Sequence, residues 1–576
     1  MGQPIQFRRG NKPNLPNLNN GEPAFVQDEK DLYVGTPNGN QLIGGKSVTD
    51  KFDQVDEQLA QIAHNVMSFG AKGDGVTDDT QAFIDANAQG NRLIVPKGKT
   101  FIVDNLTLNN VELMGGGTIK WKAASTTKMI EFNGTFNVEN IVFNGNSENQ
   151  DGINRSSILL NTSPNSTFRK CEFTNFKGKL INSDVSLSPN VTIENCVFHN
   201  TTFLSNGNVM DIRSSKWRVL NNTFSNIGKG HCIRLGLYDG DGSTTPVKNT
   251  LISGNSFEDT KHNAITLEIY TEDTTISNNF FNNNPQAIKA ESANGTVKKV
   301  LIYTNHFKDI LISTALNLSV PDVTFVNNIC ENLGGGAYFG TNFICSNNKF
   351  YRCGNGEGTN GYSISDIAGA RGVIENNQIY DSKYDAIRSR SSDVRGNVII
   401  NPVNDGIRLS EGNANVSGNY IEGAKNGIVL VSTVVNSVIS GNIIRNVMTP
   451  ISFSNNENYK TNKVISNVGV AEVETSGVRS VSIVSDAITV RDGDKLLILG
   501  TEGGESIDDL NMINGGTAGQ MLTIVTTSVS RHIVVKNNVN IRLAGSDFTL
   551  DSTVDSLTLL YTGYFWIEIS RSDNGS

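Results

Sequence analysis

A short phrase built around an isoleucine recurs in the middle of the chain and carries charged side chains at fixed positions after it. Aligning the phrase on the isoleucine places Arg213, Arg234 and Lys289 one residue later, and Glu268 and Glu291 three residues later. Alternate residues of a strand point to the same face, so all five side chains are expected on one surface. The two glutamates then occupy the same position in successive repeats, with the cations one column away.

Two carboxylates on neighbouring strands suggest acid–base chemistry on a glycan. Adjacent strands lie about 4.8 Å apart; a carboxylate separation of about 5 to 5.5 Å suits a retaining glycosidase, and a wider one an inverting enzyme. Such proximity would also raise the pKa of one carboxyl group, while lysine and arginine could hold an anionic sugar. We therefore predict two catalytic and six substrate-binding residues: Glu268 and Glu291, then Lys289, Arg234, Arg213, Asp211, Asp239 and Asp241. The alternative is a solvated charge ladder.

Two long insertions interrupt the repeat next to these strands. They read LYDGDGSTTPVKN (237–249) and RCGNGEGTNG (352–361), and long loops on one face of a repeat protein commonly wall a binding groove. Asp239, Asp241 and Glu268 could instead ligate Ca²⁺ through oxygen, although DGDG is more often only a turn. We predict no cofactor, with Ca²⁺ as the alternative, and a local pair between Asp211 and Arg213.

The elements that must position these residues are short strands with a regular repeat. A second phrase, such as NNTF, GNSF or GNVI, recurs every 20 to 33 residues and has an apolar residue two places after its central position. Alternating apolar residues within a repeat of this length predict a stack of β coils, each with one buried face. We expect a right-handed parallel β-helix of about a dozen coils over residues 67–456, with a stacked column at Cys171, Cys196, Asn222, Asn255, Asn279, Asn305, Asn328, Asn348, Asn377, Asn397, Asn419 and Asn442.

Three further segments flank the predicted β-helix. Residues 1–46 are predicted to form a small β module, and residues 457–576 a β-rich domain for trimerisation or receptor binding, in which Tyr564 and Trp566 could stack on sugars. Between residues 47 and 66 the apolar side chains follow heptad spacing, which predicts a trimeric coiled coil. The alternative is one amphipathic helix packed on the β-helix end. The heptad residues are Val48, Phe52, Val55, Leu59, Ile62 and Val66.

The stretch NVMSFGAKGDGVTDDTQAFIDANAQ (65–89) resembles the N-terminal fingerprint of the pectate-lyase-like right-handed β-helix superfamily, which includes many phage tailspikes. Here we expect Phe69 to end a strand and Thr77 to cap a helix that covers the open end of the stack through Ala82, Phe83 and Ile84. The resemblance and the residue 21–45 module together imply a homotrimeric protein of the virion tail, attached to the phage through its N-terminus.

Composition narrows the function. A net charge of −9 and a pI near 5.4 disfavour nucleic-acid binding, and the absence of an apolar run or apolar leader argues against membrane insertion or a secretory signal. The leading hypothesis is a tailspike that binds and depolymerises a host surface polysaccharide. The alternatives are a receptor-binding tail protein without catalysis and a tailspike phosphodiesterase that degrades teichoic acid.

Overall fold

The computed structural model describes most of the chain. It covers residues 8–46, 50–51, 63–150, 156–202, 207–237, 243–290, 297–311, 314–354, 361–454, 462–468, 478–491 and 493–574. Two compact units divide the chain, residues 1–284 and residues 285–576. The predicted coiled coil lies largely outside the described residues, as do Asp239, Asp241 and Glu291.

The first described element is a small four-stranded sheet. Its strands are β1 (Arg8–Gly10), β2 (Pro23–Val26), β3 (Asp31–Thr36) and β4 (Gly39–Gly45). Strand β1 pairs parallel with β2, and β2, β3 and β4 pair antiparallel. Alternate residues of β2 and β3 are buried, so the sheet packs one face on a small core that includes Leu18, Ala24 and Val26.

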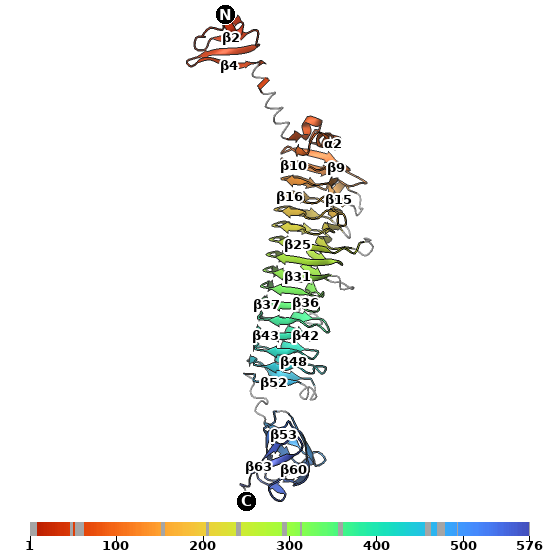
Figure 1. The fold of residues 1–576 in the computed structure, drawn as a ribbon, viewed down its shortest axis with the longest axis vertical. Coiled ribbons are helices and arrows are strands. Elements are labelled where there is room, and N and C mark those ends of the chain that lie inside the picture. The colour runs from red at the N-terminus through yellow and green to blue at the C-terminus, as the bar shows by residue number, and fades with distance from the viewer. Residues whose placement is uncertain are drawn as a thin grey trace. The chain divides into compact units, whose positions relative to one another are not determined.

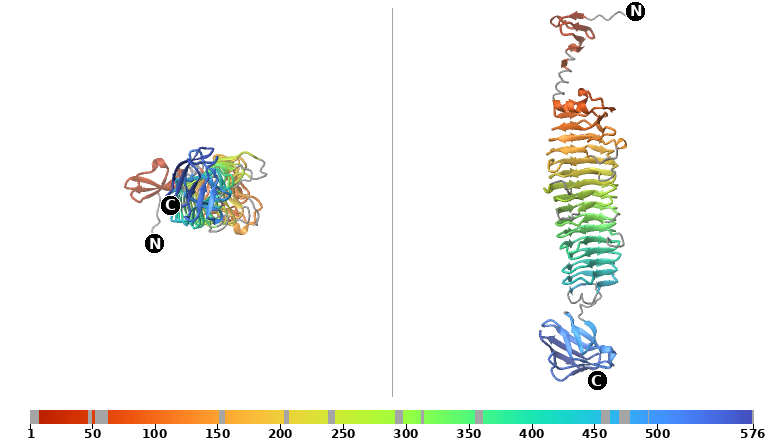
Figure 2. Two further views of the ribbon diagram at one scale, coloured as in Figure 1. Left: turned by 90° about the horizontal axis from the view of Figure 1, so that it is seen from below. Right: turned by 90° about the vertical axis from the view of Figure 1, so that its right-hand side faces the viewer.

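A parallel β-helix forms the body of both units, and Figures 1 and 2 show its strands stacked as coils. Each coil contributes one strand to each of three sheets. In residues 1–284 the first sheet runs from β5 (His64–Asn65) to β28 (Thr271–Ser277), and the second from β6 (Asp74–Asp78) to β29 (Phe280–Asn282). In residues 285–576 they run from β31 (Val297–Tyr303) to β52 (Lys463–Ile465), and from β32 (His306–Lys308) to β50 (Ile443–Arg445).

The third sheet carries the predicted site. Its strands in the first unit are β9 (Leu106–Asn109), β12 (Ile130–Asn133), β15 (Ser156–Asn161), β18 (Lys179–Ser183), β21 (Gly207–Ile212), β24 (Gly230–Leu235) and β27 (Ile265–Leu267). In the second unit they are β30 (Ile288–Ala290), β33 (Thr314–Leu318), β36 (Gly335–Phe339), β39 (Tyr362–Asp366), β42 (Asp385–Ser389), β45 (Asp405–Leu409), β48 (Asn426–Leu430) and β51 (Thr449–Phe453). Fifteen third-sheet strands among the described residues exceed the dozen coils that we expected.

The repeated Asn-Asn and Gly-Asn pairs have two distinct structural roles. The first residue of each pair adopts positive φ, as in Asn376 (55°) and Gly396 (64°), and asparagine and glycine tolerate this conformation best. The second residue is buried and hydrogen-bonds to the next coil, as predicted. Asn377 donates from Nδ2 to Asn397 Oδ1 at 3.0 Å, and its own Oδ1 accepts from the backbone N–H of Asn348 at 3.0 Å.

The apolar residue two places later also stacks as expected. The rings of Phe198, Phe224, Phe257 and Phe281 succeed one another at centroid distances of 4.8 to 4.9 Å, and all four are fully buried. Cys171 and Cys196 occupy the asparagine column in adjacent coils as free, buried thiols. Burial raises the pKa of Cys196 well above its usual range.

The stretch at residues 65–89 covers the first coil, but its local structure differs from the prediction. Phe69 ends a 3-10 helix (Val66–Phe69), and residues 74–78 form strand β6 rather than a loop. Thr77 bonds to Asp74 instead of capping a helix, because the turn at Gly75 brings its N–H and hydroxyl onto that carboxylate. The helix α2 begins later, at Thr80–Gln89.

The covering role of this helix is confirmed. Ala82, Phe83 and Ala86 of α2 are buried, and the Phe83 ring packs edge-on against Phe101 of the β-helix at 5.6 Å. Ile84, in contrast, is exposed rather than buried. Val66, which ends the predicted heptad pattern, is fully buried in the 3-10 helix.

After the β-helix, the described chain forms a compact β domain. Its main sheet joins β53 (Val478–Ser482), β55 (Leu496–Gly500), β58 (Met521–Thr526), β62 (Ser556–Tyr561), β63 (Trp566–Ser572) and β60 (Ile541–Arg542). The remaining strands are β54 (Ala487–Val490) with β57 (Met512–Gly515), and β56 (Ile507–Leu510) with β59 (His532–Val535) and β61 (Phe548–Leu550). Within the described part of the chain, no helix is long and apolar enough to span a membrane.

Candidate functional site

The register of the third sheet corrects the predicted arginine column. Met210 pairs with Ile233, so the residue opposite Arg234 is Asp211 and not Arg213. Arg213 follows the end of β21. Alignment on the shared Ile-Arg pair was misleading, because the two strands actually pair from their first glycines, Gly207 and Gly230. Aligning on those glycines would have found the register.

We call the residues that share the register of Arg234 the outward column. In the first unit its members are Thr107, Glu131, Leu159, Asn182, Asp211, Arg234 and Thr266. In the second unit they are Lys289, Asn317, Tyr338, Ser365, Arg388, Arg408, Val429 and Ser452. The column is polar along most of its length, as expected for side chains that point away from the core.

The first-unit candidates form local polar contacts. Arg234 Nε donates to Glu268 Oε1 at 3.0 Å between adjacent coils, and both side chains are partly exposed. Asp211 is almost fully buried; its Oδ2 lies 3.3 Å from Lys179 Nζ. Arg213 donates from a terminal guanidinium nitrogen to Asn182 Oδ1 at 2.8 Å. The structure thus brings Glu268 and Arg234 together.

The other predicted residues lie in the second unit or outside the described residues. Lys289 belongs to β30 in the second unit, where its column neighbour is Asn317. Glu291, Asp239 and Asp241 lie outside the described residues, so the glutamate pair and the Ca²⁺ alternative stay predictions. Among the described residues, only Asp551, Asp555 and Asp573 of the C-terminal domain lie close enough together for a metal. Backbone N–H groups already donate to both Asp555 oxygens.

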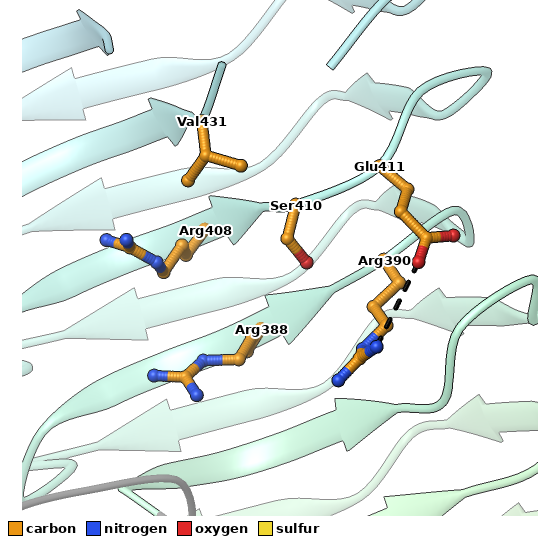
Figure 3. Close-up of a pocket in the computed structure, with 6 residues that line it drawn as sticks. All are labelled: Arg388, Arg390, Arg408, Ser410, Glu411 and Val431. Atoms are coloured by element: carbon orange, nitrogen blue, oxygen red, sulfur yellow. Dashed lines mark ion pairs between the residues drawn. The ribbon is translucent and has the colours of Figure 1, made fainter. Parts of the chain in front are cut away.

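Two adjoining hollows lie on this face in the second unit. Two cavities share Arg388 and Arg390; their volumes are about 430 and 300 Å³. We call them together the groove. The first is lined by Arg388, Arg390, Arg408, Ser410, Glu411 and Val431, as Figure 3 shows, and the second by Thr314, Asn317, Tyr338, Tyr362, Ser365, Arg388 and Arg390.

Buried aspartates orient two of the groove arginines. Asp385 accepts from a terminal nitrogen of Arg388 at 3.1 Å, and Asp405 accepts from Arg408 at 3.0 Å, each across three residues of sequence. Both aspartates are buried, and burial raises the pKa of Asp385. Asn404 donates to the second oxygen of Asp385 at 2.7 Å. The Asp-x-x-Arg spacing in DAIR and DGIR thus fixes guanidinium groups on successive coils.

A third buried carboxylate supports Arg390. Asp366 accepts from the backbone N–H of Arg390 at 2.6 Å and from Ser392 Oγ at 2.6 Å. Burial outweighs these hydrogen bonds and raises the pKa of Asp366 to about 6. The guanidinium of Arg390 lies 4.0 Å from Glu411, in an ion pair with both side chains well exposed.

Tyrosines form the other end of the groove. The rings of Tyr338 and Tyr362 lie 6.4 Å apart, and the Arg388 guanidinium carbon lies 5.8 Å from the Tyr362 ring centre. Tyr362 is nearly buried, which raises its pKa to about 12. Arg388 and Arg408 each follow an isoleucine of the same recurring phrase, as Lys289 does, so the sequence carries a signal for this region. The sequence does not show that Tyr338 belongs to the same column.

The C-terminal aromatic residues differ in exposure. Trp566 is fully buried in the domain core, so its predicted sugar-stacking role is wrong. It packs against Tyr561 at 4.9 Å, because a strand residue facing that core buries a large apolar area. Tyr564 is 87% exposed, and its predicted role in binding stays open.

Comparison with known proteins agrees with this architecture. Residues 5–36 match the family model of the major tropism determinant N-terminal domain, and residues 212–363 match that of the right-handed β-helix region. The pre-neck appendage proteins of Bacillus phages PZA and phi29 are each 42% identical over 65 residues, which is 11% of this chain and 8% of theirs. The chain therefore matches only a small part of these relatives.

The solved structures to which the chain is similar include two tailspikes and a mannuronan C-5 epimerase module. Tailspike protein 3 of bacteriophage CBA120 is 13% identical, with 97% of this chain and 84% of that chain covered and a TM-score of 0.44. The tailspike of E. coli bacteriophage HK620 is 13% identical over 70% and 80% of the chains, with a TM-score of 0.41. The Azotobacter vinelandii mannuronan C-5 epimerase AlgE6 A-module is 16% identical over 71% and 99%, with a TM-score of 0.32.

The two family models fall on separate parts of the structure. One covers the N-terminal sheet, where the sequence had predicted a virion-proximal module, and the other covers coils of the predicted β-helix. These matches support a phage tailspike protein with a right-handed β-helix fold, located in the virion tail.

Proposed function

We propose that this tailspike binds a host cell-surface polysaccharide along the groove of the third sheet during adsorption. The observation that carries the proposal is the pair of adjoining cavities, which combine tyrosine rings with oriented guanidinium groups. Sugar-binding sites need apolar ring faces and a few fixed polar groups. From β33 to β48 the groove spans six coils, or about 24 Å at the usual strand spacing, which is long enough for several sugar units.

Adsorption of the purified chain to a panel of bacterial strains tests this proposal. Tyr338→Ala removes a half-buried ring that lines the groove, and should reduce adsorption at least tenfold on any strain that binds the native chain. Tyr351→Ala is the matched control, because Tyr351 stacks on Tyr380 at 5.3 Å in the second sheet. Equal adsorption of the native chain and Tyr338→Ala would refute the groove as the receptor site.

We further propose that the bound glycan is cut on the same face of the β-helix. Glu268 and Glu291 would act as acid and base or nucleophile, with Arg234, Lys289, Arg213, Asp211, Asp239 and Asp241 holding the substrate. The contact that supports this proposal is the 3.0 Å hydrogen bond from Arg234 to Glu268, which holds the carboxylate of Glu268 beside a cation on the third sheet.

Release of fragments from the glycan that the chain binds tests the catalytic proposal. Glu268→Gln should abolish release while binding persists, because the amide keeps the shape and loses the ionisable group. Glu194→Gln is the matched control, since Glu194 pairs with Arg169 at 2.6 Å in the first sheet. Fragment masses would separate a glycosidase or lyase from a teichoic-acid phosphodiesterase. Binding without fragments from any glycan would identify a receptor-binding protein without catalysis.

A further inference from the structure

We propose that the junction of the two cavities, between Arg388 and Arg390, recognises a single negatively charged group on the bound glycan. The inference rests on the proposed glycan groove and adds the chemical class of its ligand, a glycan that carries carboxylate or phosphodiester groups. Arg388 and Arg390 are the two residues that line both cavities. A chain that occupies both cavities must therefore pass these two side chains.

The backbone places the two arginines two residues apart along the chain. Arg388 belongs to β42, and Arg390 follows the end of that strand by one residue. Residues two apart in extended chain point to the same face with Cα atoms about 7 Å apart. Long arginine side chains at that separation can converge on one anion, and the planar guanidinium matches carboxylate and phosphate oxygens.

Buried carboxylates hold the arginine side chains of the groove in fixed orientations. Asp385 accepts one hydrogen bond from Arg388 and Asp405 one from Arg408, whereas a guanidinium has five N–H donors. Each of these two arginines is thereby held by a buried carboxylate. Figure 3 shows Arg388 and Arg408 one above the other, with their guanidinium groups on the same side. Recognition would therefore depend on directed N–H groups.

Arg390 has the weakest charge compensation of the three arginines. Its ion pair with Glu411 spans 4.0 Å, with side chains 43% and 36% exposed, and exposed pairs of this kind contribute about 0 to 1 kcal/mol. The oxygens of Asp366 beneath it already accept from the backbone N–H of Arg390 and from two serine hydroxyls. A glycan anion can thus replace Glu411 at little cost, and Glu411 acts as the internal competitor for the site.

Affinity electrophoresis of the full chain tests the inference directly. The gels contain polygalacturonate, poly(glycerol phosphate) or the neutral polymer dextran. At least one acidic polymer should retard the native chain, and its identity distinguishes carboxylate from phosphodiester recognition. Arg388→Gln combined with Arg390→Gln should weaken that retardation at least tenfold. Arg395→Gln is the control, because Arg395 pairs with Glu375 at 2.8 Å in the first sheet.

A second variant keeps the test decisive if the double variant does not fold. Glu411→Gln removes the competing carboxylate and should strengthen retardation by the same acidic polymer several-fold. The inference is overturned if neither acidic polymer retards the native chain. It is also overturned if the arginine double variant and Glu411→Gln are retarded as strongly as the native chain. If Tyr338→Ala loses cell adsorption and the arginine double variant keeps it, anion recognition is refuted while the groove remains the receptor site. Normal adsorption of Tyr338→Ala would refute the groove itself.

Discussion

At the scale of single residues, the groove depends on carboxylates that never reach its surface. Asp366, Asp385 and Asp405 are buried, and each bonds to an arginine side chain or its backbone. A buried carboxylate is costly unless hydrogen bonds satisfy it, so the local sequence supplies serine and asparagine partners. These residues are positioning groups, because they hold the arginines and do not line either cavity.

Asp366 should make stability depend on pH. Its folded pKa of about 6 lies above its unfolded value of about 3.9, so the folded state binds the proton more tightly. This contribution is complete below about pH 4 and is lost as pH rises to 6, by roughly 3 kcal/mol. Urea denaturation gives the free energy of unfolding of the native protein and of Asp366→Asn. The native value minus the variant value should fall by this amount between pH 4 and pH 7. A difference that grows with pH would instead mean that the three donors depress the pKa.

At the scale of elements, the asparagine column connects each coil to the next. The amide of Asn377 bonds to Asn348, to Asn397 and to the carbonyl of Cys345. One side chain therefore satisfies two buried backbone groups of the preceding coil and bonds to the asparagine side chain of the next coil. Burial of these groups without partners would cost more than the hydrogen bonds gain.

Asn377→Ala should reduce the free energy of unfolding by about 3 kcal/mol, since it leaves the backbone N–H of Asn348 and the carbonyl of Cys345 buried without their partners. Asn415→Ala, at an exposed position of β46 (Asn415–Ser417), should change it by less than about 0.5 kcal/mol. Chemical denaturation compares the two. Similar losses in both variants would contradict the role of the column.

The elements also show how far the sequence could be interpreted. The pairs at Asn376–Asn377 and Gly396–Asn397 predicted the stack, because asparagine and glycine suit the positive φ of the turn best and an amide can bond to both neighbouring coils. The third sheet lacks such a constraint. Its β21 reads GNVMDI with apolar residues at two successive positions, so alternation alone could not decide between Asp211 and Arg213 opposite Arg234. The groove was missed because it depends on which loops and coils adjoin.

At the scale of the whole molecule, the chain combines an N-terminal β-sheet module, a β-helix and a C-terminal β domain. Heptad spacing at residues 48–66 still predicts a trimer, and the homotrimer is a proposal that mass measurement can test. Light scattering should give three times the chain mass of 62.3 kDa. Replacement of Val55 and Leu59 by lysine should lower that mass to one chain, if the heptads hold the trimer. A single-chain mass for the native protein would show that the predicted coiled coil does not hold a trimer together.

The central claim is that the groove at residues 314–431 binds a host glycan. The most direct measurement is a crystal structure of the full chain soaked with an oligosaccharide from the surface glycan to which it adsorbs. Sugar density should lie across Tyr338, Arg388 and Arg390, with an acidic group against the two guanidinium nitrogens. Sugar density confined to the C-terminal domain around Tyr564, with the groove empty, would contradict the account.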